Sequence, residues 1–99
     1  YVDDCADAIV HLMHNYDAQG HVNIGTGVEV SIQVMAETIR DLIAPGVDLR
    51  FDVSKPDGAS RMCLDIGLLR RLGWASSWAL EEGLRATVEA FIDLPERTE

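Results

Sequence analysis

The stretch from residue 21 to residue 51, HVNIGTGVEVSIQVMAETIRDLIAPGVDLRF, decides the fold that the sequence predicts. It opens with a short strand candidate, His21–Ile24, that is followed by two closely spaced glycines. Apolar residues then recur every three or four positions over Ile32–Ile43, which indicates an amphipathic helix with Ser31 as its N-cap. A proline and a glycine at 45–46 end that helix.

A second strand candidate follows the helix. Val47, Leu49 and Phe51 alternate with charged residues, and this period of two is typical of a half-buried strand. Two strands joined by one helix predict a βαβ unit with parallel strands and a right-handed crossover. The expected fold class is therefore α/β, a small lobe with two short parallel strands and about four helices.

Three further helices are expected outside this unit. The first is capped by Asp3 or Asp4 and carries Cys5 on its apolar face, where we expect a small core residue. A short helix covers Ile66–Leu72 and ends at Gly73. The last helix is marked by apolar residues at helical spacing: Leu80, Leu84, Val88 and Phe91.

Length, charge and cysteine content limit the class of protein. The 99 residues suit one compact domain, and 47% of them are hydrophobic, which allows a core. The net charge of -9 makes nucleic acid a poor partner, although one or two local cations suffice to bind a small anionic ligand. Two cysteines without a signal peptide or a membrane-length apolar run predict a reduced, cytoplasmic protein that has no membrane partner.

Two motifs that suggest ligands are better explained by structure. Asn23–Gly27 resembles a dinucleotide fingerprint, but Val30 stands where that motif needs its third glycine, so we expect a sharp turn instead. His11 and His14 are neighbours on a helix, yet nothing specifies a third metal ligand. A solvent-facing pair is the preferred interpretation of these histidines, and no metal site is expected.

The acids and thiols also give little support for catalysis. Asp3 and Asp4 are adjacent and point in different directions, which favours a helix cap and a solvated acid over a catalytic carboxylate pair. Cys63 has no base nearby in the sequence to activate its thiol. No catalytic residue is therefore assigned within this chain.

The loop Val53–Asp65 is the strongest candidate for a binding site. It has no regular period and contains a K-P-D-G turn. Lys55 or Arg61 can neutralise a diphosphate, and Asp57 can accept hydrogen bonds from sugar hydroxyls or from a base N–H. The alternative is an ordinary exposed turn in which Asp57 and Gly58 serve only the geometry.

Several runs resemble motifs of extended short-chain dehydrogenase/reductases that act on nucleotide sugars. Tyr1–Ala8 is similar to their V-D-D-x-A segment, and His21–Gly27 looks like their N-[IVL]-G-[TS]-G turn. The more specific run is Phe51–Gly58, FDVSKPDG, which resembles the F-D-x-S-K-P-D-G-x-x-R-K-x-x-D run of the GDP-fucose synthase family. The L-G-W run at 72–74 and the L-E-E-G-L run at 80–84 resemble further elements of that family.

This resemblance implies the C-terminal, substrate-binding lobe of an enzyme that converts GDP-4-keto-6-deoxymannose to GDP-L-fucose with NADPH. Residues 1–99 would form that single lobe, and the N-terminal Rossmann domain that binds NADP(H) and holds the catalytic residues would be absent. The chain alone is then expected to be inactive and to bind no cofactor. Asp57 takes the position of a family nucleotide-sugar contact, with Lys55, Gly58 and Arg61 beside it.

The chain also departs from the family pattern at several positions. Met62 stands where relatives have a lysine near the diphosphate, Ser60 replaces a proline, and Ala79 replaces a helix-capping serine. Two alternatives therefore stay open: another NAD-dependent nucleotide-sugar epimerase or dehydratase, or a stand-alone, non-catalytic acidic binding module. Helix faces that lack their cover also predict self-association into a homo-oligomer.

Overall fold

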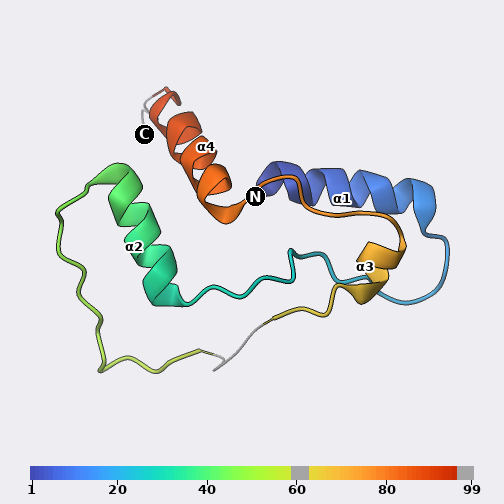
Figure 1. The fold of residues 1–99 in the computed structure, drawn as a ribbon, viewed down its shortest axis with the longest axis horizontal. Helices are drawn as coiled ribbons and strands as arrows, with labels where there is room; N and C mark the ends of the chain where they lie inside the picture. Colours follow the sequence, from blue (N-terminus) through green and yellow to red (C-terminus); the bar gives the residue numbers. More distant parts are fainter. Residues whose placement is uncertain (59–62, 96–99) are drawn as a thin grey trace.

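The structure is a computed structural model that describes residues 1–58 and 63–95. Within these residues it contains four helices: α1 (Val2–Asn15), α2 (Ile32–Ile43), α3 (Gly67–Arg71) and α4 (Leu80–Ile92). Figure 1 shows them along a winding chain in which the N-terminus lies beside the start of α4. None of these helices combines the length and the apolar character needed to cross a membrane.

The predicted α/β fold is wrong, because the described residues contain no strand and no sheet. The two strand candidates lie against different parts of the molecule. Val22 and Ile24 pack on the core, whereas Val47 and Leu49 lie beside the end of α2. A strand needs a neighbouring backbone to pair its N–H and C=O groups. Each candidate therefore remains an extended segment, and no βαβ unit forms.

The helix boundaries follow the local signals in the sequence. Ser31 is the N-cap of α2, as predicted, and its Oγ accepts a hydrogen bond from the Val34 N–H at 3.1 Å. Gly73 lies just beyond α3 with a φ of 90°, a conformation that suits glycine at a helix end. Ala79 occupies the N-cap position of α4 and makes no side-chain capping bond.

A small core lies between α1 and α3. Ala8 and Leu69 are fully buried, and Ile66 and Trp74 are nearly so. The prediction that Cys5 belongs to this core is wrong, because Cys5 is exposed. Ile9, Val10 and Met13 of α1 are exposed as well, whereas Leu12 of the same helix packs on the core.

The chain is more open than a compact domain of its size. Its radius of gyration is 17.0 Å, whereas a compact domain of this length is expected near roughly 13 Å. Its accessible surface is 8438 Å², against about 5,600 Å² for a compact protein of this mass. Ile32, Phe91 and Ile92 are more than 70% exposed. The chain thus presents apolar surface that a self-contained domain would bury.

Candidate functional site

The predicted substrate turn lies in an exposed segment that follows α2. Asp52 shapes this segment, because its Oδ1 accepts the Ser54 N–H at 3.0 Å and the Ser54 hydroxyl at 2.5 Å. The Lys55 N–H also donates to the Asp52 carbonyl oxygen at 3.4 Å. The two bonds from Ser54 lower the pKa of the Asp52 carboxyl below its ordinary value. The interpretation from sequence does not single out Asp52, although Asp-x-Ser is a common local turn pattern.

The charged groups of the turn point to open solvent. Lys55, Asp57 and Gly58 are all exposed. Within residues 1–58 and 63–95, the Lys55 ammonium and the Asp57 carboxylate have no ion-pair or hydrogen-bond partner. A Cβ added at Gly58 would meet nothing within 4 Å. These groups are therefore available to a ligand, while Arg61, the fourth predicted site residue, lies outside the described residues.

The glycine turn after the first strand candidate serves packing. Gly27 has a φ of 77°, and a Cβ there would lie 2.9 Å from Ile66 Cδ1. Asn23 donates from Nδ2 to the Asp65 carbonyl oxygen at 3.2 Å. These contacts agree with the predicted sharp turn. The space that a side chain at Gly27 would need is occupied by Ile66, so this glycine serves the packing of the turn.

The interpretation of Asp4 as a helix cap or a solvated acid is wrong. Its side chain is 7% exposed and carries two hydrogen bonds from the segment before α4. The Ser77 N–H donates to Oδ1 at 3.1 Å, and the Trp78 N–H donates to Oδ2 at 3.1 Å. The cap position of α1 is held by Tyr1, which makes no side-chain capping bond. Asp4 therefore has a structural role.

Two more polar side chains of α1 bind the same segment. Asp7 Oδ2 accepts the indole Nε1–H of Trp74 at 2.9 Å. His11 Nε2 lies 2.7 Å from the Leu72 carbonyl oxygen and donates to it. The prediction of a solvent-facing histidine pair is therefore wrong for His11. The described residues hold no group of three His, Cys, Asp or Glu side chains that could bind a metal.

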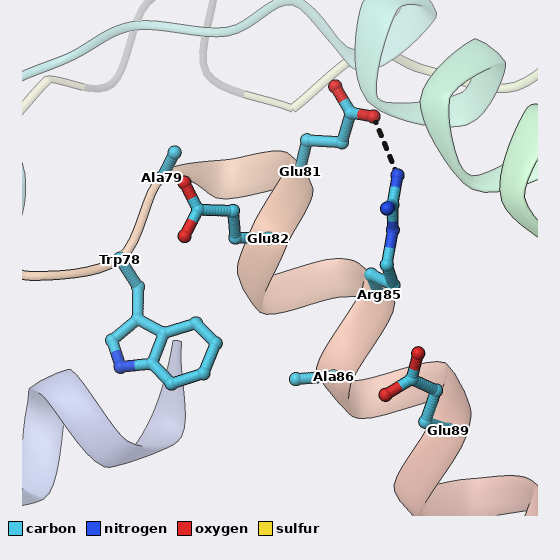
Figure 2. Close-up of a pocket in the computed structure, with 7 residues that line it drawn as sticks. All are labelled: Trp78, Ala79, Glu81, Glu82, Arg85, Ala86 and Glu89. Carbon is cyan, nitrogen blue, oxygen red and sulfur yellow. Dashed lines mark hydrogen bonds and ion pairs between the residues drawn. The ribbon is translucent and has the colours of Figure 1, made fainter.

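A shallow depression of about 420 Å³ lies along the first turns of α4. Figure 2 shows Trp78 at one end of it and three glutamates, Glu81, Glu82 and Glu89, along the helix. Arg85 pairs with Glu81 at 3.2 Å, which leaves the surface with net negative charge. A diphosphate would be repelled there, so this face is a solvated acidic helix surface.

The chain is 41% identical over 93 residues to putative GDP-L-fucose synthase 2 of Arabidopsis thaliana. It is 39% identical over 92 residues to the GDP-L-fucose synthase of Sinorhizobium fredii. The chain is homologous to a segment of the GDP-L-fucose synthases. The alignments cover 94% and 93% of this chain, but only 28% and 29% of these relatives.

The resemblance to GDP-L-fucose synthases that the motifs indicate is thus confirmed, and the match lies in the C-terminal part of those enzymes. UDP-glucuronic acid decarboxylase 3 of Arabidopsis thaliana is also similar, with 34% identity over 92 residues, which is 92% of this chain and 27% of that protein. No protein-family profile matches the chain.

Proposed function

We propose that this chain is the substrate-binding segment of a GDP-L-fucose synthase, the enzyme that converts GDP-4-keto-6-deoxymannose to GDP-L-fucose with NADPH. The observation that carries the proposal is the 41% identity to a GDP-L-fucose synthase along 94% of the chain. The exposed turn that carries Lys55 and Asp57 supports it, because an ammonium group can bind a diphosphate and a carboxylate can accept hydrogen bonds from a sugar or a base.

The two charged side chains of the turn have different roles in this proposal. The Lys55 ammonium attracts the diphosphate, which a chain of net charge -9 would otherwise repel. The Asp57 carboxylate accepts hydrogen bonds from sugar hydroxyls or from the N–H groups of guanine. Both side chains follow a turn that Asp52 and Ser54 order locally, so they start from a restricted set of positions.

The chemistry itself belongs to another part of the enzyme. Epimerisation requires an acid and a base beside a carbonyl, and reduction requires hydride delivery from the nicotinamide. In the described residues, the buried polar side chains of α1 are already engaged in packing. We therefore place the NADP(H) site and the catalytic residues in a Rossmann domain that covers the exposed apolar surface, and the 99 residues alone are inactive. The two free thiols suit a reducing compartment, the cytoplasm.

The test is Asp57→Ala in the intact enzyme, with Asp48→Ala as the matched control on another exposed aspartate. Loss of a hydrogen bond to a charged group is worth about 1.5–3 kcal/mol, so KM for the GDP-sugar should rise roughly tenfold or more while kcat changes little. Steady-state kinetics measures both constants. An unchanged KM would show that Asp57 only forms the turn, and the proposed substrate contact would be wrong.

A different nucleotide sugar is the second candidate for the substrate. The 34% identity to a UDP-glucuronic acid decarboxylase favours it, as does Met62 in place of the lysine of GDP-fucose synthases. Calorimetric titration of the intact enzyme with GDP and with UDP separates the two. Tighter binding of UDP would replace the GDP-sugar assignment and leave the role of the turn in place.

A further inference from the structure

We propose that the turn Asn23–Gly27 anchors the far end of the substrate-binding loop, and that Asn23 is a positioning residue for nucleotide-sugar binding. The inference rests on the proposed function of the Lys55–Gly58 turn. Asn23 acts through the backbone of the loop and is not assigned any contact with the substrate. Three sets of contacts lead to this conclusion.

The first contact is a hydrogen bond between segments that are distant in the sequence. The Asn23 side chain donates from Nδ2 to the carbonyl oxygen of Asp65 at 3.2 Å, across 42 positions. Asp65 in turn accepts the Gly67 N–H on Oδ1 at 2.9 Å, at the first residue of α3. Asn23 therefore fixes the backbone at the point where the loop joins α3.

The second set of contacts involves the two glycines of the turn. A Cβ at Gly25 would lie 3.6 Å from both Leu64 Cδ1 and Ile66 Cγ2, and a Cβ at Gly27 would lie 2.9 Å from Ile66 Cδ1. The missing side chain at Gly27 lets Ile66 approach the backbone of the turn closely. Ile66 is 8% exposed, so this approach belongs to the core.

The third contact extends the anchor by one more residue. Cys63 Sγ lies 3.8 Å from the Gly27 carbonyl oxygen, to which its thiol donates a weak hydrogen bond. Cys63 to Ile66 therefore all lie on the turn, directly after the loop. A hydrogen bond, a weak thiol hydrogen bond and apolar contacts thus hold these four residues against the turn Asn23–Gly27.

Chain connectivity carries the effect of the anchor to the substrate turn. Cys63 is about five residues beyond Gly58, and a stretch of that length spans at most about 18 Å. Fixing Cys63 therefore limits the volume that the turn can reach. On its other side, the bonds found among the described residues lie within the Asp52–Lys55 segment. A turn with a limited reach loses less conformational entropy when it binds a ligand.

The test compares Asn23→Asp with Asn15→Asp in the intact enzyme. Both substitutions keep the shape and remove an amide donor, but the Asn15 amide bonds to the His11 carbonyl oxygen within α1, far along the chain from the loop. One hydrogen bond is worth roughly 0.5–1.5 kcal/mol, so Asn23→Asp should raise the Kd for GDP about three- to tenfold. We expect kcat at saturating substrate and the control Kd to stay within about twofold. Amide hydrogen exchange should also become faster across residues 63–66.

Each outcome decides between the anchor and the proposed function. A weaker complex with GDP, together with faster exchange at 63–66, supports the anchor. If Asp57→Ala weakens GDP binding and Asn23→Asp does not, the anchor is refuted and the proposed function stands. Unchanged exchange at 63–66 in Asn23→Asp also refutes the anchor. If neither variant changes the Kd, the function proposed for the turn is wrong and the inference falls with it.

Discussion

The half of the molecule built by α1 and residues 63–78 is held together differently from the half built by α2 and residues 47–58. The first half contains the core residues Ala8, Leu69 and Trp74 and is closed by hydrogen bonds that span more than 60 positions. In the second half, α2 has no buried residue. Where the structure describes this half, its side-chain hydrogen bonds join residues at most four positions apart. An amphipathic pattern is thus sufficient to form a helix, but it does not by itself supply the surface that buries the apolar face.

This difference matters for function because the candidate substrate turn lies in the second half. α2 does contact α4, and the two helices lie side by side in Figure 1. However, an apolar depression of about 420 Å³, lined by Ile39, Ile43 and Leu49 among others, stays open at the end of α2. In our proposal the turn depends for its position on local bonds and on the anchor at Asn23–Gly27. The proposed Rossmann domain would bury the remaining apolar surface.

Among the substitutions that test this difference, Asp4→Ala is expected to lower the free energy of unfolding most. The substitution removes the 7% exposed carboxylate that accepts the Ser77 and Trp78 N–H groups. Hydrogen bonds to a charged group are worth about 1.5–3 kcal/mol each, so the free energy of unfolding should fall by about 3 kcal/mol. Asp48→Ala removes an exposed carboxylate and should change it by less than about 0.5 kcal/mol. Urea unfolding followed by tryptophan fluorescence measures both variants. Equal values would contradict the division into two differently held halves.

A smaller loss of stability is expected when alanine replaces a glycine with positive φ that packs on the first half or adjoins the second half. Gly27 (φ 77°) packs on Ile66 of the first half, whereas a Cβ added at Gly46 (φ 94°), which joins α2 to residues 47–58 of the second half, would meet nothing within 4 Å. Both alanines carry the backbone strain of about 1 kcal/mol, but only Gly27→Ala also forces Ile66 to move. We expect a loss of about 2–3 kcal/mol at Gly27 and about 1 kcal/mol at Gly46.

The difference between these two variants isolates the contribution of packing, because the backbone strain is common to both. Thermal unfolding monitored by circular dichroism is sufficient for the measurement. A loss at Gly46 as large as that at Gly27 would mean that the turn is not packed on Ile66 as the structure shows, and the anchor would lose its apolar part.

The sequence predicts those parts of the fold that depend on residues close together along the chain. The boundaries of α2 follow from its cap, its breakers and its apolar spacing, and apolar spacing alone predicts α4; the structure confirms both helices. The strand prediction fails because pairing depends on a second backbone that the described residues do not provide at 21–24 or at 47–51. Local patterns contain no information about such a partner.

The same limit explains which site residues the sequence identifies. Lys55, Asp57 and Gly58 are indicated by a turn motif and a family resemblance, and the structure shows them exposed. Asp4 and His11 are misinterpreted from sequence, because their partners lie 61 to 74 positions away. A polar residue on a helix looks solvated until the segment that covers it is known. Their spacing with Asp7, on one face of α1, is the available signal.

The smallest change in stability is expected from Ser54→Ala, which tests whether the bonds of the substrate turn are local. The Ser54 hydroxyl and N–H both hold the pKa of Asp52 below its ordinary value of 3.8, and the substitution removes only the hydroxyl. The pKa of Asp52 should therefore rise part of the way back, as measured by ¹³C NMR of the carboxyl group.

The sign of the pH effect follows from the direction of that shift. Because the folded-state pKa of Asp52 is lowered, its ionised form favours the folded turn above the ordinary pKa, and this contribution is lost as the pH falls through the folded-state value. Ser54→Ala should reduce the contribution only slightly, since Asp52 is exposed. Amide resonances of α1 should not move, because the Asp52 bonds stay within their own turn. A shift that spread to α1 would show that the two halves are coupled through this turn.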